Sequence, residues 1–218
     1  MPQDSRLAQL LCSRLCHDLV GPAGAVNAGL ELAGDGDLDA ASLELINESA
    51  AVITARLAFF RVAFGTGGGK LSAEGTLSVN EARALASDLM AEGRVELDWP
   101  EGSHAPATLA AGVGKALLLM ILVAADCLPR GGRVTVHTAS LPEGIGMAVV
   151  ALGSNARLRD DLSQALAAPE ADETVTARNV HAYFAQHLAR VEGGRIEAAC
   201  ESDQEIRLMA LFRNDEST

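Results

Sequence analysis

Residues 11–33 read LCSRLCHDLVGPAGAVNAGLELA, and this stretch decides how the N-terminal part of the chain folds. Leucines recur along it at three-to-four spacing, which is typical of a helix with one apolar face. A histidine and an acid, His17 and Asp18, followed by two glycines and a proline, interrupt its middle. Glycine and proline weaken a helix interior. The sequence therefore predicts a helix whose centre is adapted to a task other than packing.

The sequence predicts that this helix runs from about Ser5 to Ala33 and ends at a glycine-rich turn. A second helix, from about Leu38 to Phe64, has apolar residues at the same spacing. Each helix exposes an apolar stripe, and a hairpin of two helices cannot cover both stripes by itself. We therefore expect residues 1–66 to pair with a second copy and form a dimeric four-helix bundle.

His17 is predicted to point away from the apolar stripe of its own helix. At about 100° per residue, the stripe centres at about 160° from His17. The face around His17 carries small residues, with a cation and apolar side chains beside them, whereas a solvated face is normally charged. Such a face is suited to close approach by another protein. The candidate partner-binding residues on it are Leu10, Ser13, Arg14, Val20, Gly21 and Gly24.

Other interpretations of this stretch stay open. A surface histidine without a role, beside a glycine–proline kink, has the same sequence. A metal site is the sharper alternative, because Cys12, Cys16 and His17 lie close together in the sequence. His17 is rotated by about 100° from the nearer cysteine, and no fourth ligand follows nearby. We therefore predict no metal site, and the roles of Cys12 and Cys16 stay open.

The composition of the chain excludes several function classes. A net charge of −12 argues against a nucleic-acid partner, because phosphate contacts need clustered Lys and Arg. No apolar run reaches bilayer length, and residues 1–10 lack the basic start and apolar core of a signal peptide. Four cysteines without such a signal are typical of reduced thiols. We expect a soluble, cytoplasmic protein with no membrane partner.

The second part of the chain has a mixed pattern. Residues 65–75, GTGGGKLSAEG, predict a linker and match a phosphate-binding loop poorly, because Leu71 stands where Ser or Thr is required. Residues 71–218 then alternate helices and strands in the order of a two-layer α+β sandwich. The predicted helices span about 78–92, 106–128, 157–167 and 175–192, and the predicted strands about 94–99, 133–140, 146–152, 193–200 and 205–212.

The motif HDLVGP, residues 17–22, resembles the H-box of sensor histidine kinases. In that family a helix carries the phosphorylated histidine, an acid follows it, and a proline stands five residues after it. His17, Asp18 and Pro22 occupy these positions. The likeness implies that the hairpin is a dimerisation and phosphotransfer domain, with His17 as the phosphoacceptor. It also implies that Asp18 orients or polarises the imidazole, although a solvated helix acid stays the alternative.

Residues 71–218 resemble the ATP-binding domain of the same kinases but depart from it where ATP is bound. Val123 stands where kinases place a magnesium-binding Asn, and Ala151 where they place an adenine-binding Asp. The segment ARNVH, residues 177–181, replaces a glycine-rich loop, whereas GGRIE at 193–197 is retained. The resemblance therefore implies a degenerate domain that binds no ATP and no metal.

A kinase-like hairpin followed by a degenerate ATP-binding domain is similar to the ChpT-type histidine phosphotransferases. This likeness implies a homodimer that relays phosphoryl groups between receiver-domain aspartates through a phosphohistidine at His17. It further implies a hybrid-kinase receiver as donor and CtrA-like regulators as acceptors. Magnesium would come with the receiver, so the chain needs no cofactor. Two alternatives stay open: an active sensor-type histidine kinase, and a non-catalytic receiver-docking or antikinase protein.

Overall fold

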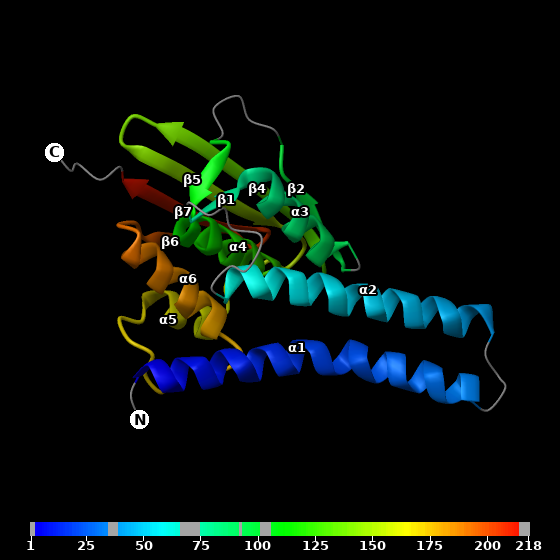
Figure 1. Ribbon diagram of the computed structural model, residues 1–218. Helices are drawn as coiled ribbons and strands as arrows, with labels where there is room; N and C mark the ends of the chain where they lie inside the picture. Colours follow the sequence, from blue (N-terminus) through cyan, green and yellow to red (C-terminus); the bar gives the residue numbers. More distant parts are fainter. Residues whose placement is uncertain (1–2, 35–38, 66–74, 92, 101–105, 214–218) are drawn as a thin grey trace.

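Two long helices form the hairpin that the sequence predicts. The computed structural model describes residues 3–34, 39–65, 75–91, 93–100 and 106–213. Helix α1 spans Gln3–Gly34 and α2 spans Ala40–Ala63, and the two lie side by side with their connected ends projecting beyond the rest of the molecule (Figure 1). Of the linker predicted at residues 65–75, Gly65 and Gly75 are described and 66–74 lie outside the described residues.

The two helices approach closely near their connected ends. Gly29 of α1 is buried, and a Cβ added there would collide with the side chain of Ile46 in α2. At the start of α2, the Asp39 carboxylate accepts a hydrogen bond from the backbone N–H of Ser42 at 2.7 Å, which satisfies one of the free donors of the first turn. Local capping and one close contact thus fix the geometry of the hairpin.

Apolar side chains of the hairpin remain exposed. The predicted stripe of α1 is only partly covered by α2, and further leucines of α2 face solvent. The large apolar side chains left exposed on the hairpin are Val20, Leu30, Leu32, Leu43, Leu45 and Leu57. This chain alone therefore leaves several large apolar side chains of the hairpin uncovered.

The remainder is an α+β domain, which we call the sandwich. Its main sheet has the strand order β2-β4-β5-β7-β6, with β2 parallel to β4 and the other neighbours antiparallel. The strands of this sheet are β2 (Val95–Asp98), β4 (Gly132–Leu141), β5 (Gly144–Leu152), β6 (Ile196–Ser202) and β7 (Glu205–Arg213). The helices are α3 (Val79–Met90), α4 (Ala111–Asp126), α5 (Asp160–Ala167) and α6 (Val180–Val191).

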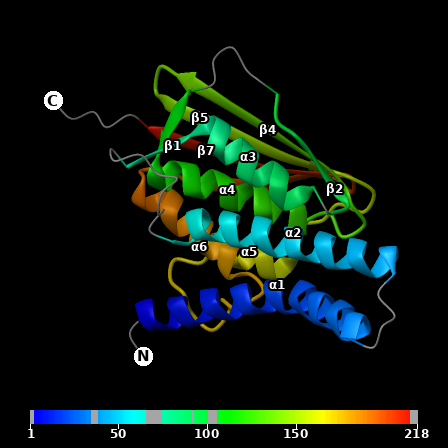
Figure 2. The same cartoon turned by 45° about the vertical axis from the view of Figure 1, so that its right-hand side comes forward.

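Helix α4 forms the centre of the core. It is apolar on all sides and buried along most of its length, which is the pattern of a helix enclosed by other elements. It contacts α2, α3 and α6 on one side and the sheet on the other. Figures 1 and 2 show this layering, with the sheet outermost, the helices of the sandwich next and the hairpin beneath them. The predicted helical hairpin followed by an α+β sandwich is confirmed by this architecture.

Some boundaries predicted from the sequence are wrong. The helix expected over about 106–128 begins only at Ala111, because β3 (Thr108–Ala110) pairs instead with β1 (Thr76–Ser78) in a small antiparallel sheet. Ser78 precedes α3 as predicted, but its side chain makes no capping hydrogen bond. Pairing between distant segments overrides the local helical pattern at this point.

The last predicted helix also begins later than expected, at Val180 rather than near Val175. Residues 176–179 form a turn in which the Asn179 side chain accepts a hydrogen bond from the backbone N–H of Thr176 at 2.7 Å. Similarly, α5 begins at Asp160 and not at residue 157. No helix within the described ranges is long and apolar enough to cross a membrane.

Candidate functional site

His17 lies in the middle of α1 with its side chain 81% exposed, on the face predicted to be free. Its Nδ1 is 3.1 Å from Oδ1 of Asp18. A carboxylate can only accept, so this contact assigns the proton to Nδ1 and leaves the lone pair on Nε2. The two side chains therefore meet, and Nε2 is the ring nitrogen that keeps a free lone pair.

Asp18 is held by an arginine one helical turn before it. Arg14 donates from Nε to the second carboxylate oxygen, Oδ2, at 2.7 Å, so each oxygen of Asp18 has its own partner. The Asp18 side chain is only 16% exposed, which makes it poorly described as a solvated helix acid. Its position next to His17 is therefore fixed from the side opposite the imidazole.

Pro22 explains a second contact at Asp18. Proline has no backbone N–H, so the carbonyl four residues earlier, that of Asp18, has no helical partner. Arg56 of α2 donates from Nη1 to this carbonyl. The proline of the motif thus creates a free acceptor next to His17, and the second helix of the hairpin satisfies it.

Arg14 also reaches the sandwich. Its Nη1 donates to the backbone carbonyl of Arg178 at 3.0 Å and lies 3.3 Å from Nδ1 of His181. Both Nη atoms lie 3.5 Å from Oδ2 of Asp126. The side chain is 12% exposed, so the expectation that Arg14 is a free cation beside His17, available to a partner, is wrong. Its donors are directed into the molecule instead.

His181 and Asp126 form the inner end of this arrangement. His181 is fully buried, and burial lowers the pKa of its imidazole although Asp126 opposes the shift. Its Nε2 lies 3.3 Å from Oδ2 of Asp126, off the line of a good hydrogen bond. Burial works against the charge on Asp126, but the imidazole of His181 and the charges of Arg14 and Arg159 hold the pKa of that carboxyl below its usual range. A neutral imidazole thus lies against an ionised carboxylate.

Asp126, His181 and Arg56 are not among the site residues that the sequence predicts. All three lie outside the H-box motif, residues 17–22. The only signal was the segment ARNVH, which ends at His181 and stands where a glycine-rich loop was expected. Asp126 and His181 come close to Arg14 only because α1 packs against α6, which no local motif predicts.

A cleft of about 720 Å³ opens beside His17, between α1 and the loops of the sandwich. Ser13 lines it and is exposed, in agreement with its predicted place on the His17 face. Three arginines and three aspartates supply most of its polar surface. Its lining residues are Ser13, Arg14, His17, Asp18, Asp126, Arg159, Asp161, Ala177 and Arg178.

The other predicted partner-binding residues differ in their accessibility. Val20 is 69% exposed, and a Cβ added at Gly21 or Gly24 would meet no heavy atom within 4 Å, so this part of the helix surface is open. Leu10 is partly buried and packs against the core. Less of Leu10 than of Val20 is therefore open to a partner, because the sandwich covers the N-terminal turns of α1, and its predicted role in partner binding stays a prediction.

Two residues that the resemblance places at kinase ATP-binding positions lie in the core of the sandwich. Val123 in α4 and Ala151 in β5 are fully buried. The segment that replaces the glycine-rich loop is fixed by Asn179, whose side-chain amide donates to the carbonyls of Asp161 and Thr174 at 3.0 Å each. These residues form part of a closed core in the sandwich.

Metal ligands do not gather in the part of the chain that the structure describes. No group of three or more His, Cys, Asp or Glu side chains there is placed to hold an ion. Cys12 and Cys16 are exposed on α1. Cys127 is buried, and burial raises the pKa of its thiol to about 12, so it stays protonated.

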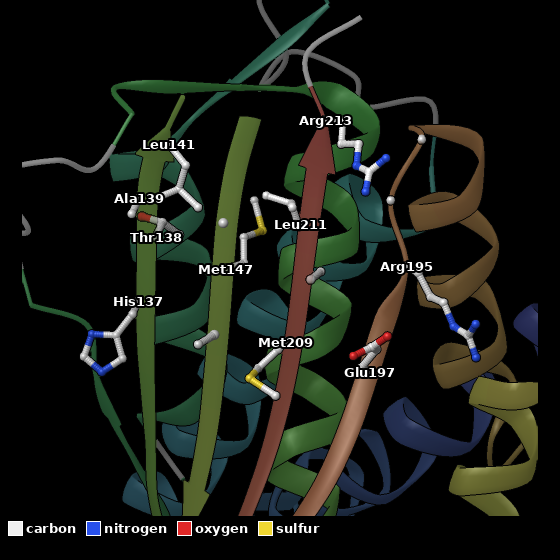
Figure 3. Close-up of a pocket in the computed structure, with 15 residues that line it drawn as sticks. His137, Thr138, Ala139, Leu141, Met147, Arg195, Glu197, Met209, Leu211 and Arg213 are labelled. Atoms are coloured by element: carbon white, nitrogen blue, oxygen red, sulfur yellow. The ribbon is translucent and has the colours of Figure 1, made fainter. Parts of the chain in front are cut away.

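A second hollow, of about 650 Å³, lies on the sheet face opposite the helices (Figure 3). Small residues are among those that line it: Ala139 of β4 pairs with Gly146 of β5, and Ala148 lies two residues further along β5. Leu141 and Met209 border it. It shares no lining residue with the cleft beside His17, so it is a separate feature of the surface.

Comparison with known proteins identifies the family. The family described as "Histidine phosphotransferase C-terminal domain" matches residues 79–204. The chain belongs to this family. Protein phosphotransferase ChpT of Brucella abortus is 33% identical over 190 residues, which is 87% of this chain and 88% of that protein. The predicted likeness to ChpT-type histidine phosphotransferases is thereby confirmed.

Solved structures agree with this assignment. A bacterial phosphotransferase superposes with a TM-score of 0.83 at 28% identity, covering 96% of this histidine phosphotransferase and 98% of the other chain. The histidine kinase AdeS of Acinetobacter baumannii has a TM-score of 0.50 at 13% identity over 91% of this chain and 98% of its own, which shows a shared fold alone. The protein is thus a ChpT-like histidine phosphotransferase with a kinase-like fold.

Proposed function

We propose that this histidine phosphotransferase relays phosphoryl groups between the aspartates of receiver domains through a phosphohistidine at His17. The observation that carries the proposal is the exposed imidazole of His17, held by Asp18 at Nδ1 and standing beside an open cleft. Phosphotransferase activity requires a nucleophile accessible to the aspartyl phosphate of a partner. His17 has that accessibility, whereas His181 is buried.

In the proposed reaction, Nε2 of the neutral imidazole attacks the phosphorus of the aspartyl phosphate in line. The new N–P bond forms as the P–O bond of the acyl phosphate breaks, and the receiver's aspartate leaves as a carboxylate. Positive charge develops on the ring, and the Asp18 carboxylate at Nδ1 stabilises it. The reverse reaction passes the group to a second receiver. Because positioning dominates such transfers, a pre-oriented ring is the main contribution of this chain.

The partners follow from the same proposal. We take a hybrid-kinase receiver as the donor and CtrA-like regulators as acceptors, by likeness to ChpT. Magnesium comes with the receiver, and the histidine phosphotransferase needs no cofactor of its own. Val20, Gly21 and Gly24 offer an open surface next to His17 for docking, together with Ser13 at the cleft. We place this relay in the cytoplasm.

A homodimer completes the proposed assembly. Leu43 and Leu57 are both about half exposed and, 14 residues apart, lie on the same face of α2, a face that a second hairpin would cover in a four-helix bundle. His17 points away from α2, so both copies of the site would stay accessible in such a dimer.

The test is transfer of label from phosphorylated receivers. The purified protein should acquire acid-labile, base-stable phosphate from a phosphorylated receiver, and His17→Gln should acquire none. His187→Gln is the matched control, since His187 is also exposed but lies on α6. Label in His17→Gln equal to wild type would assign the phosphoacceptor elsewhere. No label in any protein would favour a receiver-docking protein without transfer.

A nucleotide titration separates the relay from an active kinase. Calorimetry with ATP and Mg²⁺ at millimolar concentration should show no saturable heat. Val123 and Ala151, both buried, stand where kinases have the Asn that binds magnesium and the Asp that binds adenine. Saturable binding followed by labelling from ATP would establish the kinase alternative in place of the relay.

A further inference from the structure

We propose that Asp126 and His181 of the sandwich are positioning residues for the transfer at His17, and that they act through Arg14 and Asp18. The inference rests on the proposed role of His17. It concerns four residues, which we call the Arg14 cluster: Arg14, Asp18, Asp126 and His181.

The cluster is a continuous series of contacts from the phosphoacceptor into the sandwich. The imidazole of His17 meets Oδ1 of Asp18 at 3.1 Å, and Oδ2 of Asp18 meets Nε of Arg14 at 2.7 Å. The Nη atoms of Arg14 then meet Nδ1 of His181 at 3.3 Å and Oδ2 of Asp126 at 3.5 Å. Every step joins atoms at contact distance, so a change at the inner end can reach the imidazole.

The helix alone would hold Arg14 and Asp18 together only weakly. An i, i+4 ion pair on a solvated helix contributes about 0.3–0.5 kcal/mol, and its side chains exchange between rotamers. Here the guanidinium is 12% exposed and has acceptors from α4, α6 and the loop before α6. Since a guanidinium is a rigid planar fork, fixing its Nη atoms also fixes the direction of its Nε.

The fixed Nε determines how Asp18 is presented. Arg14 engages one carboxylate oxygen, and the other remains for Nδ1 of His17. Without the inner contacts, the guanidinium is free to rotate, and Asp18 can turn with it. The imidazole would then exchange between tautomers and rotamers, and Nε2 would be the available nucleophile for a smaller fraction of the time.

His181 suits its place in the cluster only as a neutral ring. Burial lowers the pKa of its imidazole, so Nδ1 retains the lone pair that accepts from Arg14. The proton then lies on Nε2, facing Asp126 at 3.3 Å. Nδ1, as an acceptor, therefore faces the donor Arg14, and Nε2–H, as a donor, faces the carboxylate of Asp126. Asp126 in turn balances the charge of Arg14 inside the molecule.

This arrangement gives the degenerate domain a task that needs no nucleotide. Asp126 ends α4, and His181 lies in the first turn of α6, so two helices of the sandwich that pack against each other also set the geometry at His17. A hairpin without the sandwich would keep His17 and Asp18 but lose the groups that direct Arg14.

The test compares Asp126→Asn, His181→Leu and His181→Gln with wild type. Gln can accept from Arg14 and donate to Asp126, whereas Leu can do neither, so Gln should restore what Leu removes. His187→Leu is the control on the same helix, since His187 is exposed. Thermal unfolding and circular dichroism first establish that each variant is folded. If His181→Leu does not fold, Asp126→Asn still tests the proposal, because it preserves size and shape.

Two readouts distinguish positioning from a structural role. The maximal transfer rate from a saturating phosphorylated receiver should fall roughly 10–100-fold in Asp126→Asn and His181→Leu, with the half-saturating receiver concentration unchanged. In nitrogen-15 spectra of the imidazoles, His17 should lose its preference for the Nδ1–H tautomer in the same variants. His181→Gln and His187→Leu should remain near wild type in both measurements.

Three results would overturn the proposal: an unchanged maximal rate, an unchanged tautomer, or a loss confined to receiver affinity. Failure of the relay itself looks different, because wild type would then transfer nothing. The tautomer of His17 still reports in that case whether Asp126 and His181 orient the imidazole.

Discussion

The hairpin and the sandwich place their apolar residues in opposite ways. In the sandwich, α4 is buried by the sheet on one side and by helices on the other. In the hairpin, α2 leaves Leu43, Leu45 and Leu57 about half exposed. Both regions are rich in leucine and alanine, so composition does not separate them. The two regions differ in burial: one chain is enough to bury the core of the sandwich, but not the apolar side chains of the hairpin.

The same contrast applies to polar groups. Asn179 and Gln186 of the sandwich are buried with their amides satisfied by backbone groups, which fixes structure without leaving reactive atoms. His17 in the hairpin is exposed, and only its Nδ1 contacts a neighbouring group. The proposed phosphotransfer thus takes place on the hairpin, which stays open, and in our proposal the closed sandwich supports it.

The largest expected effect is on association of the hairpin. Leu57→Glu should raise the dimer dissociation constant by roughly 10²–10⁴, because a two-fold bundle loses a buried leucine twice, at about 1.5–3 kcal/mol each. Met209→Glu is the matched control, since Met209 is 40% exposed against 50% for Leu57 but lies on the sheet. Sedimentation equilibrium measures both. A monomeric wild type at micromolar concentration would contradict the four-helix bundle.

The next effect is on folding stability. Leu118→Ala in α4 should lower the free energy of unfolding by about 2–5 kcal/mol, because the residue is fully buried and its loss leaves a cavity. Leu43→Ala in α2 should cost only about 0.5 kcal/mol or less. Urea titrations in the Leu57→Glu background make the comparison on monomers. Equal losses at both positions would mean that α2 is covered within one chain.

A smaller effect is expected at the contact between the two helices of the hairpin. Arg56→Ala should lower the free energy of unfolding by about 1–3 kcal/mol, because the Asp18 carbonyl freed by Pro22 loses its donor. Arg61→Ala, an exposed arginine of the same helix, is the control and should change stability little. Denaturant titration of both variants measures the difference. Equal stabilities would show that water replaces Arg56 at this carbonyl.

The smallest effect is a pH dependence that arises in the sandwich. Burial lowers the pKa of His181 in the folded state, so below the unfolded value of about 6.5 the unfolded chain binds the extra proton. Stability should therefore fall as the pH drops below about 6.5, with a limiting slope of about 1.4 kcal/mol per pH unit. Asp126 does not titrate in this window, because its pKa is held below its usual range.

Unfolding in urea at pH 7.5 and pH 5.5 measures this slope. His181→Gln should remove most of it, whereas His137→Gln should preserve it, since His137 is exposed on β4. A slope that persists in His181→Gln would assign the titration to another group.

The sequence predicts the fold well where periodicity is strong. The hairpin helices and β4, β5, β6 and β7 lie where their patterns place them, because each buries one face against a neighbour. The errors occur where a distant partner decides. Thr108–Ala110 would continue a helix by local pattern, but Thr76–Ser78 pairs with it as a strand. No local pattern records such a partner.

The candidate site divides in the same way. His17, Asp18 and Pro22 stand in one short motif, which a resemblance can identify. Arg14 was recognised as a cation near His17, but its direction depends on His181, which is 167 positions away. Contacts over that distance depend on how α1 packs against α6 and are absent from any single stretch of sequence.

Pro22 has a further consequence, for protein engineering. The six-residue motif HDLVGP is short enough to transfer to another protein. However, the Asp18 carbonyl that Pro22 leaves without a helical partner accepts its hydrogen bond from Arg56 of α2. Grafted onto an isolated helix, the motif would keep the proposed nucleophile, but the Asp18 carbonyl would have only water as a hydrogen-bond donor. A designer who wishes to move this chemistry to another scaffold must therefore transplant an arginine on a second, neighbouring helix as well as the motif.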